Sequence, residues 1–142
     1  MKKISSTKNI VSVFALCVFA FANVSAQSIY WIGGTGNWND AAHWSNASGG
    51  ASCACTPSAN NNVIFDANSF SGNAQTVTIN AVAYCKNMDW SGITSSSIQM
   101  SGTSDLHISG SLTMKSTMNT NNYTGILYFE STATGNTITS AG

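Results

Sequence analysis

The hydrophobic residues of this chain come in short pieces in which apolar and polar side chains alternate. Alternation with a period of two is typical of a β-strand with one buried face. Eight pieces follow this pattern, at residues 29–32, 63–65, 77–79, 98–100, 106–108, 112–114, 126–129 and 137–139. Clusters of Gly, Asn, Ser and Thr separate them and favour turns. No longer stretch after residue 26 has the apolar spacing of an amphipathic helix, so we predict an all-β chain.

The second half of the chain also repeats, at an interval of about 20 residues that is typical of a solenoid. This shift aligns Ile98 with Met118 and Ile138, Leu106 with Ile126, and Ile108 with Tyr128. In a solenoid, stacked coils line up like side chains and pair the backbone. We therefore predict a parallel β-solenoid. An antiparallel β-sandwich is the alternative, since strands at regular short spacing also occur there.

The start of the chain, residues 1–26, has the pattern of a secretory signal peptide. Lys2, Lys3 and Lys8 form a basic start, residues 10–22 are apolar, and Val24-Ser25-Ala26 supplies small residues before a cleavage site. The apolar stretch, which contains Cys17, is shorter than the ~20 residues of a membrane span, and nothing later is longer. We expect cleavage after Ala26 and a secreted or cell-surface protein without membrane insertion.

The remaining 116 residues carry little charge, and half of them are Ser, Thr, Asn or Gly. They contain no Arg and two lysines, Lys86 and Lys115, against five acids, so their net charge is −3. Such a chain has no basic surface for phosphate groups. We therefore expect no binding to nucleic acid or to anionic membrane surfaces.

An aromatic and glycine-rich motif follows the signal-like segment. Residues 30–45 read Y-W-I-G-G-T-G-N-W-N-D-A-A-H-W-S, and Pro57 and the strand-like V-I-F-D at 63–66 come next. This pattern resembles the start of large secreted bacterial surface proteins of the parallel β-helix, adhesin-like or autotransporter-passenger type, above all those of the Bacteroidota. The resemblance covers residues 30–66, with 77–90 as a looser continuation. It implies a right-handed β-helix entered through an aromatic-rich N-terminal cap.

These patterns divide the chain into a signal peptide at 1–26, a cap segment rich in aromatic residues, Gly and Cys at 27–66, and solenoid coils at 67–142. The chain lacks the C-terminal sorting domain of the proteins it resembles, and its repeats run to Gly142 without a capping segment. An open solenoid end exposes unpaired backbone and apolar side chains. We therefore expect the sequence to be the amino-terminal fragment of a longer protein, or the product of a truncated reading frame, with its coils truncated.

Three tryptophans of the motif, Trp31, Trp38 and Trp44, have two interpretations. Aromatic side chains bury a large area, and a chain this poor in other large apolar residues needs them for its core. Alternatively, their rings form a platform that stacks against sugars. The glycines at 33–36 favour tight turns between the tryptophans. They do not predict a phosphate loop, because no Lys-Ser or Lys-Thr and no helix follows.

Cys53, Cys55 and Cys85 remain after signal cleavage. A disulfide is expected in an oxidising compartment. A bridge within Cys-x-Cys is strained, so we predict that Cys85 pairs with Cys53 or Cys55 and leaves one thiol over. His43 and His107 are not at zinc-like spacing from these cysteines, so no metal site and no cofactor are expected.

Few residues are equipped for catalysis. Asp89 and Asp105 are isolated in the sequence, whereas glycan hydrolases use paired carboxylates. The closest acid–histidine pair is Asp105 and His107, which would share one face of a strand and bond to each other at the surface. No motif activates a serine nucleophile. We therefore predict no catalytic residues and no enzymatic activity.

The expected function is that of a secreted cell-surface scaffold segment, structural or adhesive. The alternative is a carbohydrate-binding segment, or the lead-in to a β-helix enzyme that degrades glycans. The expected partners are extracellular glycans or another cell-surface protein.

Overall fold

The computed structural model describes residues 25–140, so nearly all of the expected signal peptide lies outside the described residues. The described part is all-β, as predicted: a single 3-10 turn, η1 (Ala41–His43), accompanies thirteen short strands. No helix in residues 25–140 is long and apolar enough to cross a membrane. The strands are β1 (Ser28–Trp31), β2 (Gly36–Asn37), β3 (Trp44–Ser45), β4 (Asn62–Ile64), β5 (Thr76–Ile79), β6 (Ala83–Cys85), β7 (Asn87–Asp89), β8 (Ile98–Gly102), β9 (Leu106–Ile108), β10 (Leu112–Thr113), β11 (Met118–Tyr123), β12 (Leu127–Phe129) and β13 (Ile138–Thr139).

The strands form three sheets that the chain visits in turn. Sheet A has the order β13-β10-β7-β4-β1-β3, sheet B the order β11-β8-β5-β2, and sheet C the order β12-β9-β6. Every pair is parallel except β1 with β3. The architecture is therefore the predicted parallel β-solenoid, and the antiparallel sandwich is wrong.

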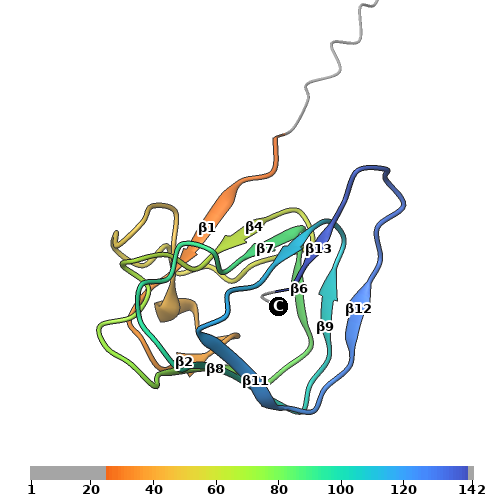
Figure 1. Cartoon of the computed structure of the whole chain (residues 1–142). Coiled ribbons are helices and arrows are strands. Elements are labelled where there is room, and N and C mark those ends of the chain that lie inside the picture. The colour runs from red at the N-terminus through yellow and green to blue at the C-terminus, as the bar shows by residue number, and fades with distance from the viewer. Residues whose placement is uncertain (1–24, 141–142) are drawn as a thin grey trace, which may run out of the picture.

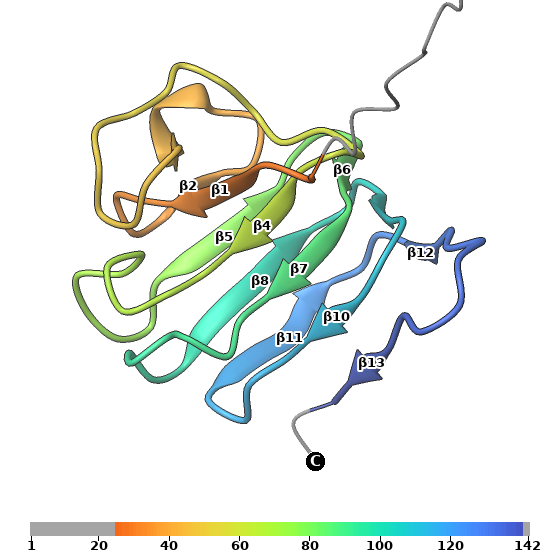
Figure 2. The same cartoon turned by 90° about the horizontal axis from the view of Figure 1, so that it is seen from above.

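Figure 1 looks along the axis of the solenoid, with sheet C on the right, sheet A at the top and sheet B at the bottom. Sheet C runs upward and sheet A then runs to the left, so the chain turns counter-clockwise in this view. Figure 2 shows the coils from above, one after another, with the C-terminal coils on the side that faces the viewer of Figure 1. A chain that turns counter-clockwise as it approaches the viewer is right-handed.

The predicted repeat interval of about 20 residues is confirmed for one aligned pair. Ile98 pairs with Met118 in sheet B, as expected. Sheet C is shifted by one position: Leu106 pairs with Leu127 and Ile108 with Phe129, in place of Ile126 and Tyr128. The shift arises because β11 has one extra residue relative to β8: Asn119 pairs with Gln99, but Asn122 pairs with Ser101. Leu127 therefore faces inward like Leu106, and Tyr128 faces outward like His107.

Ile138 belongs to a different sheet from the one that the repeat predicted. It pairs with Leu112 in sheet A, and not with Met118 in sheet B. Leu112 in turn pairs with Met88, and the chain between Met88 and Leu112 is shorter than the chain between Leu112 and Ile138. Because the corners between sheets differ in length, the coils of this solenoid do not share one period.

The core consists of rows of inward side chains that run along the axis. One row of sheet A contains Ile29, Val63, Met88 and Leu112, which the strand register places side by side. A second row is aromatic: the rings of Phe65 and Trp90 stack with centroids 3.5 Å apart and planes 6° apart. All of these side chains are buried, and each contributes about 1.5–3 kcal/mol through its removal from water.

The segment between β1 and β4 covers the N-terminal end of this core. β3 folds back against β1 in the one antiparallel pair, and this places Trp44 opposite Trp31. The loop also brings Trp38 to the cluster, where its ring meets the Trp44 ring edge-on with centroids 4.8 Å apart. Aromatic side chains therefore close the N-terminal end of the core.

Candidate functional site

The three motif tryptophans are all buried at the N-terminal end of the core. The His43 ring stacks on Trp31 with centroids 4.7 Å apart, and Trp44 meets the same indole edge-on at 4.9 Å. The indole nitrogens are also satisfied: Trp31 Nε1 donates to Gly34 O, and Trp44 Nε1 donates to Trp38 O, each at 2.7 Å. These rings pack against one another, and none of them has a face open to a ligand in this structure.

The glycines of the motif allow this packing. Gly33 and Gly34 adopt φ of +82° and +77°, in the left-handed region that glycine tolerates best. Gly36 is required for a different reason, because a Cβ there would lie 2.0 Å from His43 Nε2. Asp40 then caps the turn η1 by accepting from Ala42 N at 2.9 Å.

The disulfide differs from the predicted one. Cys53 is bonded to Cys55, with their Cα atoms 5.2 Å apart, so the prediction that Cys85 takes part in the bridge is wrong. Ala54 between them has φ of +52°, which turns the chain tightly enough to bring the two cysteines into bonding range. Cys85 is a free thiol on β6, where it points into the core beside Ile108.

The five carboxylates after Ala26 are each tied to a structural partner. Asp40, Asp66, Asp89 and Asp105 accept hydrogen bonds from the backbone N–H groups of Ala42, Asn68, Ser91 and Ile126, and Glu130 accepts one from His107. The first three close tight local turns, as Asp side chains commonly do. The expected bond between Asp105 and His107 is not formed, because Asp105 binds the next coil.

An aromatic column on the outer face of sheet C was missed in the sequence. Tyr84, His107 and Tyr128 stack in register on β6, β9 and β12, with centroids 4.8 Å and 4.6 Å apart. His107 Nδ1 lies 2.7 Å from Glu130 Oε1. The His107 ring is covered on both faces, whereas Tyr84 and Tyr128 at the ends of the column are 43% and 37% exposed. The stacked rings therefore join the three strands of sheet C across the coils.

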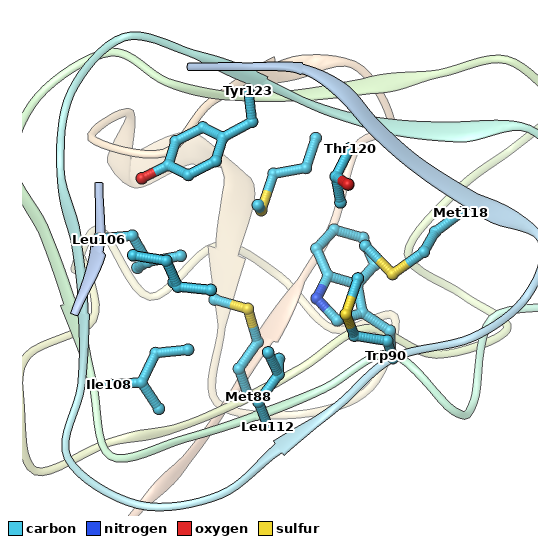
Figure 3. A pocket seen from close by; sticks show the side chains of 11 residues that line it. Met88, Trp90, Leu106, Ile108, Leu112, Met118, Thr120 and Tyr123 are labelled. Carbon is cyan, nitrogen blue, oxygen red and sulfur yellow. The ribbon is translucent and has the colours of Figure 1, made fainter. Parts of the chain in front are cut away.

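The C-terminal end of the core contains an apolar hollow of about 240 Å³. Figure 3 shows that all three sheets line it: sheet A supplies Met88 and Leu112, sheet B supplies Met118 and Tyr123, and sheet C supplies Leu106 and Ile108. The polar groups of its lining are few. The Tyr123 hydroxyl lies within hydrogen-bond distance of two backbone carbonyls, and burial, together with the charge of Asp105, raises the pKa of Tyr123 to about 12. The hollow offers apolar surface without an ionised group in its lining.

Several large apolar side chains near the C-terminal end of the described residues are exposed. Phe129 and Ile138 belong to inward rows, yet they are 42% and 59% exposed because no further coil lies against them in residues 25–140. Ile126 and Tyr128 on the same coil are also exposed.

Within residues 25–140, no three His, Cys, Asp or Glu side chains gather where they could hold one metal ion. Comparison of the chain with protein-family models, with curated proteins and with solved structures gives no match. Its function is therefore inferred from its own residues.

Substitution of Gly36 by Ala should destabilise the cap. The added Cβ must displace the His43 ring from Trp31 and weaken the bond from His43 Nδ1 to Ile32 O, which together should cost about 1–3 kcal/mol. Urea unfolding followed by tryptophan fluorescence measures the loss. Gly72→Ala is the matched control, because a Cβ there meets nothing within 4 Å. Equal stability of both variants would contradict this account of the motif.

The thiol of Cys85 should resist alkylation in the folded protein. Burial raises its pKa from 9.0 to about 12, so little reactive thiolate exists at neutral pH. Mass spectrometry of residues 27–142 after iodoacetamide treatment should find no label on the native chain, one label after unfolding, and three after unfolding and reduction. Above pH 9 the Cys85 thiol loses its proton in the unfolded chain but keeps it in the folded one. The free energy of unfolding should therefore fall as pH rises from 9 toward 12. Rapid native labelling of Cys85 would contradict its buried position.

Proposed function

We propose that this chain is a secreted cell-surface scaffold segment of a bacterial protein, with a structural or adhesive role and no reaction of its own. The observation that carries the proposal is the use of its carboxylates. Each of the five caps a turn or joins two coils, so the acids that a hydrolase would need are employed in holding the solenoid together. The aromatic column on sheet C has the same role.

The pattern of residues 1–26 supports export to the cell surface, and the low charge of the remainder suits a structure exposed to varied surroundings. A right-handed β-solenoid is also a repetitive shape whose length grows with the number of coils, which suits display at a distance from the cell. The alternative, a carbohydrate-binding segment, would require a surface other than the buried tryptophans.

Export can be tested by expressing the full chain in a Gram-negative bacterium. We expect the exported protein to begin at Gln27, as read by N-terminal mass spectrometry, because Val24-Ser25-Ala26 fits the cleavage site. Leu16→Asp breaks the apolar stretch and should leave the uncut chain in the cytoplasm. Val82→Asp makes the same chemical change at an exposed site and should not affect export. A chain that stays uncut in the cytoplasm without substitution would contradict the proposed location.

Substitution of Trp44 by Ala separates the scaffold from the carbohydrate alternative. Because Trp44 is buried between Trp31 and Trp38, its truncation should cost about 3–5 kcal/mol and unfold the cap, as seen by circular dichroism and urea unfolding. Glycan-array binding of the wild type and the variant supplies the second readout. A variant that keeps its fold but loses glycan binding would favour the carbohydrate-binding segment over the scaffold.

A further inference from the structure

In the proposed exported form, the chain begins at Gln27, directly before β1. Gln27 is exposed, and Figure 1 shows its segment, in orange, approaching β1 from outside the coils. Two hydrogen bonds hold the residue: its carbonyl oxygen accepts from Asn62 N at 2.9 Å, and its side-chain Nε2 donates to Asn46 Oδ1 at 2.8 Å. The residue that becomes the new N-terminus is therefore anchored through its carbonyl group, with its side chain at the surface.

We propose that Gln27 is a modification site that closes to pyroglutamate after export. The neutral α-amine attacks Cδ of the same side chain, and the new N–Cδ bond closes a lactam ring. The Cδ–Nε2 bond breaks, and Nε2 leaves as ammonia with a proton from the α-amine. Both reacting groups belong to one residue, so no oxidant and no second reactant are needed. This inference rests on the cleavage after Ala26 that the proposed function includes.

The fold accommodates the lactam. The backbone carbonyl of Gln27 is not part of the ring, so it still accepts from Asn62 N, and the pairing of β1 with β4 is unchanged. The bond from Nε2 to Asn46 Oδ1 is lost with the ammonia. Asn46 is exposed, so water takes the place of this donor. Cyclisation should therefore leave the stability of the solenoid nearly unchanged.

The surroundings of the new terminus favour the loss of its charge. A hollow of about 380 Å³ lies at the corner between sheets C and A. The described residues that line it include no acid; they are Ala26, Ala59, Asn60, Lys86 and Ser109. Cleavage removes Ala26 and leaves the α-amine of Gln27 at the edge of a hollow that also contains Lys86. A like charge opposes protonation of the amine, so Lys86 favours the neutral nucleophile, and the lactam then removes the charge altogether.

The modification would protect the first strand of the core. Aminopeptidases need a free α-amine, and chain termini are preferred sites of proteolysis. β1 pairs with both β3 and β4, and its inward residues Ile29 and Trp31 are buried. Stepwise removal of residues from Gln27 onward would destroy the strand that joins the cap to the coils. A pyroglutamate has no free α-amine, so it blocks the first step.

Mass spectrometry of the exported chain, treated while folded with glutaminyl cyclase, tests the proposal. We expect an N-terminal peptide that begins at residue 27 and is lighter than the glutaminyl form by one ammonia. Gln27→Asn is the matched control, because it keeps the carboxamide but would have to close a smaller and strained ring, so its amine should stay free. A synthetic peptide of residues 27–36 confirms that the cyclase is active.

The possible failures are distinguishable in the same spectrum. A folded chain that keeps a free Gln27 while the peptide converts would overturn the cyclisation and leave the proposed export intact. An uncut chain, or one that begins at another residue, would overturn both, because the site then does not exist.

Aminopeptidase digestion of the folded proteins tests the protective role. The cyclised chain should keep its N-terminus, whereas the Gln27→Asn variant should lose residue 27. Urea unfolding before and after digestion shows how far a loss of residues weakens β1. Equal trimming of the cyclised chain and the variant would overturn the protective role.

Discussion

No coil of this solenoid can bury its own inward side chains, so each depends on the layer next to it. The aromatic row of sheet A shows this dependence most directly. Trp90 stacks on Phe65 at 3.5 Å, Phe65 packs against Trp31 with centroids 6.0 Å apart, and Trp31 is itself covered by His43. The row begins in the cap and ends at the open hollow. Each coil is therefore stabilised by contacts with the coils next to it, as expected for a repeat structure. The side chains that cover an end of the core matter as much as the packing between coils.

The two ends of the described solenoid differ in how their inward side chains are covered. At the N-terminal end, glycines at 33–36 bend the chain so that Trp38, His43 and Trp44 fold over Trp31. At the C-terminal end of residues 25–140, the inward residues Phe129 and Ile138 are exposed, because no further coil of the described residues lies against them.

The all-β class and the solenoid could be predicted because alternation and repetition are properties of neighbouring positions in the sequence. The register could not, because it depends on a local irregularity: one extra residue in β11, between Asn119 and Asn122, placed Leu127, and not Ile126, over Leu106. That shift also hid the column of Tyr84, His107 and Tyr128. The disulfide was wrong for a local reason, since the positive φ of Ala54 that lets Cys53 reach Cys55 leaves no mark in a pattern of residue types. Burial of the tryptophans could be predicted from their size. Their hydrogen-bond partners could not be predicted from the sequence pattern.

The outward side chains of the coils contribute less to stability than the inward ones. Thr78 and Ser101 bond to each other across two coils at 3.1 Å, and Asn122 bonds to Gln99 at 2.8 Å, so these polar side chains add links between layers. Such surface links each contribute only about 0.5–1.5 kcal/mol, whereas an inward Leu or Ile contributes through both burial and close packing. Outward residues can therefore change with little loss of stability while the inward rows stay fixed. A solenoid built this way separates the residues that hold the fold from those that meet the surroundings, and any recognition of a surface partner is to be sought on its outer faces and corners.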